Sequence, residues 1–321
     1  MKRRTIVKIL LGNSTMGASS LLFGQPKSDQ PIHIVVPYPA GGNTDLVTRE
    51  IARALSDRLG TPVIIDNKVG ANSIIGSDFV AKAAPDGRTI LTTLGAFTIN
   101  PFLYKNLPYS LDQFSPISLL GQVNLILAVG SELPAKSFDD LIKYAKSGAR
   151  VTYDSSGVGS ALHIVGERIS RATGLKATHI PYKGISQSLP DIVAGRVTFT
   201  LNTVASLGPF INEGKLRPLV TLSRSRSPQL PGVPTIIEAG YPALESYGWQ
   251  GFVAPAKTPK RLIDQLSRDI SAVLQAPDMR KKLVGMGMDA IGSSPAEFES
   301  FIKDDTAKVA TTIKEAGIVA E

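Results

Sequence analysis

Apolar strand-like segments alternate with amphipathic segments from Pro31 onward, and this alternation limits the possible folds more than any other feature. Residues 32–59 combine a short apolar run with a segment whose apolar side chains recur at every fourth position. The same unit recurs over residues 151–173 and 178–194, and the chain from Pro259 onward has a helical pattern. Because strands that alternate with helices are typical of α/β domains, we predict an α/β fold with mostly parallel sheets.

Two loops that lead from a strand into a helix are rich in glycine and in hydroxyl or amide side chains. Their central residues are Gly41-Gly42-Asn43-Thr44 and Ser155-Ser156-Gly157-Val158-Gly159-Ser160. At a helix start several backbone N–H groups have no partner within the helix, and the helix dipole adds about half a positive charge. Such loops can bind an anion without arginine or lysine; the alternative is an ordinary tight turn before a capped helix. Two loops of this kind suggest two lobes with a cleft between them.

The sequence around these loops lacks the motifs of common enzymes. A dinucleotide fingerprint beginning at Gly157 needs glycine or alanine at position 162, and a nucleophile elbow at Ser160 needs glycine at 158 and 162, where valine and leucine stand. The histidines, His33, His163 and His179, are not spaced as metal ligands, and cysteine is absent. We therefore predict no catalytic residue, no metal site and no cofactor.

The first 24 residues resemble a targeting segment. They begin with Lys2-Arg3-Arg4, contain no acidic residue, and continue into an interrupted apolar stretch too short to span a bilayer. We predict a signal peptide at residues 1–24, exported by the general or the twin-arginine route, and hence a periplasmic protein; the alternative is a cytosolic tail. The formal charge of +8 partly reflects this segment, and the remaining bases are scattered among acids. We therefore predict no nucleic-acid partner.

Eight short sequence blocks, two of which contain the loops described above, are distributed along the chain. They are residues 37–45, 67–71, 85–89, 153–160, 181–184, 214–217, 231–235 with 238–240, and 249–251. In this order the blocks resemble those of the Bug receptors, the solute-binding components of tripartite tricarboxylate transporters. The resemblance covers the chain from about Pro31 to the C-terminus.

The resemblance implies a type II periplasmic binding protein fold, in which two crossings join two lobes around a ligand cleft. The first lobe would comprise residues 31–127 and 247–321, and the second residues 128–246. It also implies that the loops starting at Tyr38 and Ser155 hold a carboxylate with the help of ordered waters. The predicted ligand-binding residues are Tyr38, Gly41, Gly42, Asn43, Thr44, Ser73, Ser155, Ser156, Gly157, Gly159, Ser160, His163, Tyr182, Lys183 and Gly184.

The function implied by the resemblance is the capture of a small organic anion by a monomeric binding protein that docks onto the membrane subunits of its transporter. One alternative is a ligand-loaded periplasmic sensor that signals to a receptor kinase, and the sequence does not separate the two. An enzyme that uses Ser156 or Ser160 is a third and weaker hypothesis.

The chain departs from the family pattern near the expected mouth of the cleft. Asn43 and Ser73 stand where the family has other residues, and they either recognise the distal polar end of the ligand or cap helices. Lys183 either pairs with a second carboxylate of the ligand or extends into solvent along Tyr182.

Four other polar or aromatic residues receive an interpretation from their position. Asp45 in the first helical turn is expected to complement the helix dipole rather than bind a cation. His33 is interpreted as structural, and His163 either contacts the ligand or supports the fold. Trp249 is expected to pack near the second crossing between the lobes.

Overall fold

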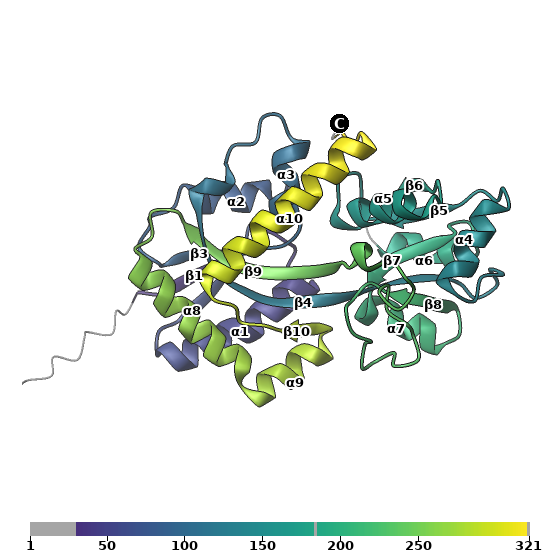
Figure 1. The fold of residues 1–321 in the computed structure, drawn as a ribbon. Coiled ribbons are helices and arrows are strands. Elements are labelled where there is room, and N and C mark those ends of the chain that lie inside the picture. The colour runs from purple at the N-terminus through teal and green to yellow at the C-terminus, as the bar shows by residue number, and fades with distance from the viewer. Residues whose placement is uncertain (1–29, 183–184, 320–321) are drawn as a thin grey trace, which may run out of the picture.

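The computed structural model describes residues 30–182 and 185–319 and shows two lobes joined by long strands (Figure 1). The predicted signal peptide, Lys183 and Gly184 lie outside the described residues. The strand β4 (Phe114–Gly130) runs through both lobes, and β9 (Tyr247–Pro255) pairs with its first part in the antiparallel direction. The chain therefore crosses between the lobes along two neighbouring strands, as the sequence predicts.

The first lobe is built on parallel strands in the order β2-β1-β3, followed by β9 beside β3 and by the first part of β4 beside β9. These strands are β1 (Ile32–Val36), β2 (Val63–Asn67) and β3 (Thr89–Thr93), and β10 (Met288–Ala290) joins β4. The helices of this lobe are α1 (Asn43–Leu59), α2 (Ile74–Ala81), α3 (Ala96–Leu103), α8 (Lys260–Gln275), α9 (Pro277–Gly285) and α10 (Pro295–Ala316), with a short 3-10 turn η1 (Leu111–Gln113).

The second lobe repeats this arrangement on the other part of β4. Its parallel strands β5 (Thr152–Ser155), β6 (Thr178–Pro181) and β7 (Phe199–Thr203) have the order β7-β5-β6, and β8 (Leu216–Thr221) pairs with β4. Its helices are α4 (Phe138–Lys146), α5 (Ala161–Thr173), α6 (Ile185–Val193) and α7 (Val204–Asn212), with a 3-10 turn η2 (Pro242–Leu244).

The prediction of mostly parallel sheets is only half right. The strands that lead into the glycine-rich loops are parallel to their neighbours, whereas every pair that involves β4 or β9 is antiparallel. The reason is topological, because a strand that crosses to the other lobe and one that returns run in opposite directions.

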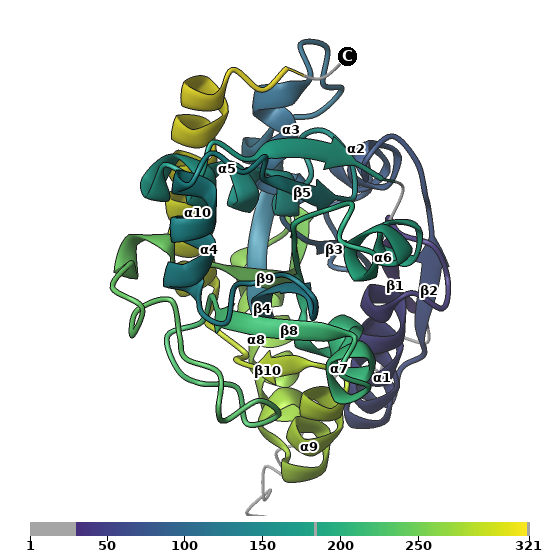
Figure 2. The same ribbon diagram turned by 90° about the vertical axis from the view of Figure 1, so that its right-hand side faces the viewer.

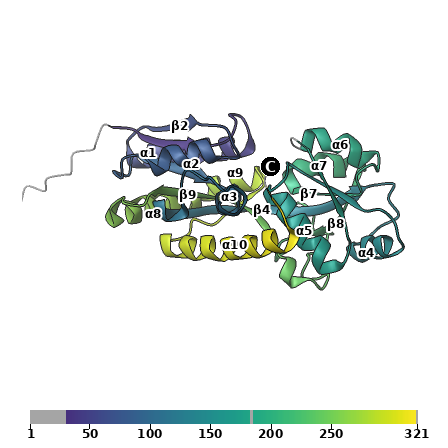
Figure 3. The same ribbon diagram turned by 90° about the horizontal axis from the view of Figure 1, so that it is seen from above.

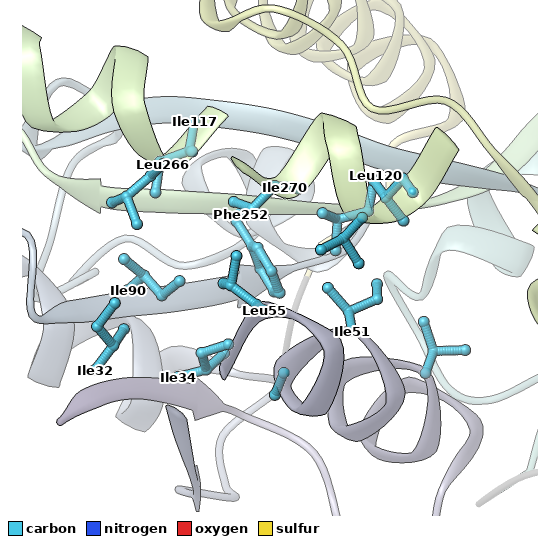
Figure 4. Packing of buried hydrophobic residues seen from close by; sticks show 14 of the residues in the cluster. Ile32, Ile34, Ile51, Leu55, Ile90, Ile117, Leu120, Phe252, Leu266 and Ile270 are labelled. Atoms are coloured by element: carbon cyan, nitrogen blue, oxygen red, sulfur yellow. The ribbon is translucent and has the colours of Figure 1, made fainter. Parts of the chain in front are cut away.

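The apolar spacing of α1 buries one face of the helix against the sheet of the first lobe. Val47, Ile51 and Leu55 are fully buried, and Figure 4 shows Ile51 and Leu55 beside Phe252 of β9. The helix ends where Gly60 adopts a left-handed conformation and donates its N–H to the Ser56 carbonyl over 2.8 Å. The first loop is thus anchored directly to the core of its lobe.

The long helix α10 also connects the two lobes. Figures 2 and 3 show its C-terminal end beside α5, and an apolar cluster fills the space between these helices and α3. This interlobe cluster contains the buried residues Ile99, Leu103, Ile164, Val309 and Ile313. Among the described residues, no helix has the length and apolarity needed to cross a membrane.

Candidate functional site

The parallel strands of each lobe carry their loop–helix junctions at one edge of the sheet. In the first lobe β1, β2 and β3 lead into α1, α2 and α3, and in the second lobe β5 and β7 lead into α5 and α7. The junctions touch across the lobes, because a Cβ added to Gly95 at the start of α3 would lie 3.1 Å from the Cβ of Ala161 in α5. The start of α3 therefore meets the start of α5 across the two lobes.

The helix starts of the two lobes differ in how their backbone donors are satisfied. In the first lobe no side chain caps α1, α2 or α3, whose N-cap residues are Gly42, Ser73 and Gly95. In the second lobe the hydroxyls of Ser160 and Thr203 accept backbone N–H groups of α5 and α7. Backbone carbonyls accept the first-turn amides of Ile74 in α2 and of Phe97 and Thr98 in α3, so the free donors of the first lobe lie mainly at the start of α1.

Asp45 organises the first loop (residues 38–44). Its buried carboxylate accepts the Gly41 N–H at 2.9 Å, Arg49 Nε at 2.8 Å and Asn67 Nδ2 at 2.9 Å. Burial works to raise the pKa of Asp45, but hydrogen bonds from Arg49, Gly41 and Asn67 prevail and hold it at about 2. The residue stands at the start of α1 as predicted, and it also fixes the shape of the loop.

The two glycine amides of the first loop donate hydrogen bonds to neighbouring residues of the same segment. Gly41 donates to Asp45, and Gly42 donates to the Pro39 carbonyl over 3.3 Å. The amides of Asn43 and Thr44, in the first turn of α1, have no helical partner by virtue of their position. An anion at this loop would therefore meet the amides of Asn43 and Thr44 rather than those of the two glycines.

Tyr38 and Ser73 come together from different loops. Burial raises the pKa of the Tyr38 hydroxyl, and a side-chain hydrogen bond with Ser73 opposes this shift. Ser73 occupies the N-cap position of α2, but its side chain makes no capping bond. The alternative that Ser73 caps the helix with its hydroxyl is therefore wrong, because that hydroxyl is turned to Tyr38.

The backbone before α2 adopts an uncommon conformation. Ala71, Asn72 and Ser73 have φ values of 45°, 50° and 72°, which non-glycine residues seldom adopt. The Asn72 side chain donates to Asn100 Oδ1 over 2.8 Å, and Asn100 returns a bond of 2.8 Å to the Asn72 carbonyl. This reciprocal pair holds the strained turn that places Ser73 beside Tyr38.

The second loop (residues 155–160) is held by bonds to its own lobe. Ser155 is buried, and its hydroxyl donates to the Gly157 carbonyl at 2.9 Å and accepts the Gly157 N–H at 3.1 Å. The Gly159 N–H donates to His163 Nδ1 at 2.9 Å, and Ser160 caps α5. Ser156 is the exposed hydroxyl of the loop.

Tyr182 contacts the second loop through its backbone, while its side chain points to another partner. The Tyr182 N–H donates to the Ser155 carbonyl at 2.9 Å, and the hydroxyl donates to Asp191 Oδ2 at 2.6 Å. Burial and the neighbouring Asp191 raise the pKa of Tyr182 to about 12. A direct contact of this hydroxyl with a ligand would have to compete with Asp191.

Sequence reasoning missed two polar residues near the loops. Asp154 is buried in β5, where Oδ2 accepts the Ser188 hydroxyl at 2.5 Å and burial raises its pKa. Gln250 of β9 is buried, and its Nε2 donates to Thr48 Oγ1 of α1 over 2.9 Å. Both residues lie within the sequence blocks 153–160 and 249–251, and the further sequence signal at each position is a polar residue inside an otherwise buried strand.

Two further sequence interpretations concern residues away from the loops. His33 of β1 is half-buried, with its Nδ1 2.8 Å from Asp66 Oδ2 on β2. Trp249 is buried in β9, with its ring edge-on to Phe298 and Phe301 of α10 at centroid distances of 5.9 and 5.4 Å. Both positions agree with structural roles, and Trp249 lies in the second crossing itself.

In the described part of the chain, no group of three histidine or acidic side chains is placed to hold a metal ion. A cavity of about 490 Å³ lies on another face of the first lobe, lined mainly by apolar residues that include Phe97, Phe102, Phe114 and Ile302. That cavity is bounded by α3, α10 and the crossing strands and touches neither loop.

Comparison with known proteins identifies the family of this chain. Residues 47–318 match the family model described as the tripartite tricarboxylate transporter family receptor. The periplasmic binding protein BugD is 32% identical, with a TM-score of 0.75 over 90% of this chain and 99% of that chain. A protein of R. palustris solved with adipate is also 32% identical, with a TM-score of 0.79 over 90% and 98%. MatC from Rhodopseudomonas palustris with bound malate is 27% identical, with a TM-score of 0.74 over 88% and 98%.

These similarities confirm the predicted periplasmic binding protein fold and the resemblance to Bug receptors. Members of this family bind a solute and are not enzymes. This argues against the hypothesis of a hydrolase that uses Ser156 or Ser160. The chain belongs to the tripartite tricarboxylate transporter receptor family of periplasmic solute-binding proteins.

Proposed function

We propose that the protein captures a small carboxylate in the periplasm and delivers it to the membrane subunits of a tripartite tricarboxylate transporter. The observation that carries the proposal is the set of helix starts without side-chain caps in the first lobe, together with the contact of the α3 start with α5 of the second lobe. Two similar proteins have been solved with adipate and with malate, which are small dicarboxylates. Residues 1–24 would direct export and be removed from the mature protein.

In this proposal one carboxylate lies at the start of α1, where the Asn43 and Thr44 amides donate to it. Ser156 and the helix start of α5 approach it from the second lobe, and ordered waters fill the remaining contacts. Tyr38 and Ser73 lie at the neighbouring junctions and would meet the distal end of the ligand. Lys183 would supply the positive charge for a second carboxylate.

A proline at position 43 tests the amide contact directly. Gly42 has φ −70° and ψ 160°, which is the conformation that a residue before proline prefers, and Asn43 is the first helical residue, where proline is well tolerated. Asn43→Pro therefore removes one N–H donor while α1 is retained. We expect about tenfold weaker binding of whichever of adipate or malate binds the wild type, measured by calorimetry, because a bond to a charged group is lost.

Asn43→Ala is the matched control, since it removes the amide side chain and keeps the N–H. Equal binding by Asn43→Pro and the wild type would contradict the proposed contact. Protein freed of co-purified acid should be stabilised by about 2.7 kcal/mol at a ligand concentration of about 100 times Kd. Adipamide, which has the length of adipate without its charge, should give no stabilisation, and the absence of any effect from the two acids would argue against them as ligands.

A further inference from the structure

Two histidine rings stack beneath the second loop, inside the second lobe. The rings of His163 on α5 and His179 on β6 have centroids 3.8 Å apart and planes inclined by 13°. The ring of Tyr153 lies 5.2 Å from that of His179 and is itself stacked on Phe199 at 5.4 Å. The two histidine rings thus belong to a packed layer of aromatic rings that borders the second loop.

Each imidazole binds one atom of the loop. The Gly159 N–H donates to His163 Nδ1 at 2.9 Å, and His179 Nε2 lies 2.6 Å from the Ser155 hydroxyl. An Nδ1 atom that accepts a hydrogen bond carries no proton, so neutral His163 has its proton on Nε2. The two contacts hold both ends of the glycine-containing segment, because Ser155 precedes it and Gly159 closes it.

The surroundings favour neutral rings. Burial lowers the pKa of His163, although Glu167 on the same helix opposes the shift from 4.0 Å. Burial and the adjacent His163 lower the pKa of His179 to about 4. Among the described residues the Tyr153 hydroxyl also faces the rings, and it donates to Glu167 at 2.8 Å. Both rings are therefore neutral at neutral pH.

We propose that His163, stacked on His179, acts as a positioning residue for the carboxylate site, holding the second loop in its binding conformation only while the His163 ring is uncharged. A proton on His163 Nδ1 turns the acceptor of the Gly159 N–H into a donor, so the loop loses this bond and binds the ligand more weakly. This inference rests on the proposed function, because it assumes that the second loop contacts the ligand.

The same glycine also meets the opposite lobe. A Cβ added to Gly159 would lie 2.1 Å from Leu103 Cδ1 of α3, so the loop is confined between His163 on one side and Leu103 on the other. A shift of Gly159 toward either side would change both the anion site and the contact between the lobes. The imidazole pair is therefore placed to affect ligand affinity without touching the ligand.

The test compares two substitutions of His163 that differ in hydrogen-bonding capacity. His163→Leu removes the acceptor, whereas His163→Asn keeps an oxygen near the Nδ1 position and cannot take up a proton in this pH range. Binding of adipate and malate is measured by calorimetry between about pH 5 and pH 8. We expect His163→Leu to bind about tenfold more weakly at neutral pH, and His163→Asn to bind like the wild type.

As the pH falls below the ordinary histidine value of 6.5, the wild type should weaken more steeply than His163→Asn. The comparison is made at each pH, because the carboxylates of the ligand also titrate at the acidic end. His33→Gln, which changes a histidine on the far strand β1, serves as the control and should follow the wild type. Equal affinity of His163→Leu and the wild type, or equal pH profiles of the wild type and His163→Asn, would overturn the inference.

Nuclear magnetic resonance of the ligand-free protein separates this inference from the proposed function. If neither acid binds the wild type, the proposed function fails for these ligands, while the Gly159 amide still reports on the loop. Its resonance should move on His163→Leu and should titrate together with the His163 ring, and it should not move on His33→Gln. A Gly159 amide that is insensitive to His163 would overturn the positioning role whatever the ligand.

Discussion

Gly159 of the second lobe and Leu103 of the first lobe are in such close contact that no Cβ fits between them. A Cβ on Gly159 would lie 2.1 Å from Leu103 Cδ1, and the φ of Gly159 is +73°. The contact places the loop that we propose to bind the ligand directly against α3 of the opposite lobe. The room between Gly159 and Leu103 therefore affects both the shape of the second loop and how closely the two lobes approach each other.

Gly159→Ala is expected to weaken ligand binding by interfering with this approach. The left-handed backbone alone would cost about 1–2 kcal/mol of folding stability, and the new methyl group would also have to displace Leu103. Calorimetric affinity for the ligand and urea denaturation, measured on the same variant, separate the two effects.

Gly174→Ala provides the control for the backbone cost. Gly174 ends α5 with a φ of +70°, and an added Cβ there would meet nothing within 4 Å. It should lose a similar amount of stability and keep its affinity. The explanation would be wrong if Gly174→Ala bound as weakly as Gly159→Ala, or if adding Leu103→Ala to Gly159→Ala restored no affinity.

Asp45→Asn is expected to destabilise the protein by about 2 kcal/mol at neutral pH, because the folded state holds the pKa of Asp45 at about 2 instead of 3.8. A carboxyl whose pKa is lowered on folding stabilises the protein above its unfolded pKa. This contribution is present above about pH 4 and is lost as the pH falls toward 2. Urea denaturation of the wild type and the variant at several pH values measures the difference.

The exposed Asp57 on the same helix gives the comparison. Asp57→Asn should change the free energy of unfolding little at any pH. A stability gap between Asp45→Asn and the wild type that stays constant from pH 7 to pH 2 would exclude the carboxylate charge as its source.

Local signals in the sequence were sufficient for the elements that carry the loops. The predicted loops at residues 41–44 and 155–160 lead into helices that begin at Asn43 and Ala161. Both end at a left-handed glycine, which is a signal that depends only on neighbouring residues. The loops followed from these boundaries, and so did their position at the edges of the two sheets.

Features that depend on distant residues were not predicted. The region after Pro259 was expected to be helical, but residues 288–290 form β10, which exists because it pairs with residues 121–123 of β4. A three-residue strand has no periodicity of its own. The sequence left two roles open for His163, and its bond to Gly159 and stacking on His179 depend on the packing of β6 beside β5.

Ile164→Ala is expected to loosen the contact between the lobes. Ile164 is 3% exposed in the interlobe cluster, and truncation of a buried isoleucine typically costs about 2–5 kcal/mol. Because the partners of Ile164 belong to α3 and α10, the loss should favour an open arrangement. Small-angle scattering of the ligand-free variant should give a larger radius of gyration than the wild type.

Ile169→Ala is the matched control, since Ile169 is fully buried in the core of the second lobe alone. It should reduce stability without changing the radius of gyration or the ligand affinity per folded molecule. If the two variants have the same radius of gyration, the interlobe cluster does not hold the lobes together in solution.

The stability of the protein should fall as the pH drops from about 6.5 to about 4, in part because of His179. Burial and His163 lower the pKa of His179 from 6.5 to about 4, so between these values the unfolded chain binds a proton that the folded protein does not. The contribution of neutral His179 to the free energy of unfolding is fully present above about pH 6.5 and decreases by up to about 3 kcal/mol toward pH 4.

His179→Gln retains an amide near Nε2 for the Ser155 hydroxyl but has no titrating group, so the stability of this variant should depend less on pH in this range. Urea denaturation at half-unit pH steps measures this, with His33→Gln as the control, and a variant whose pH profile coincides with that of the wild type would show that His179 is protonated equally in both states.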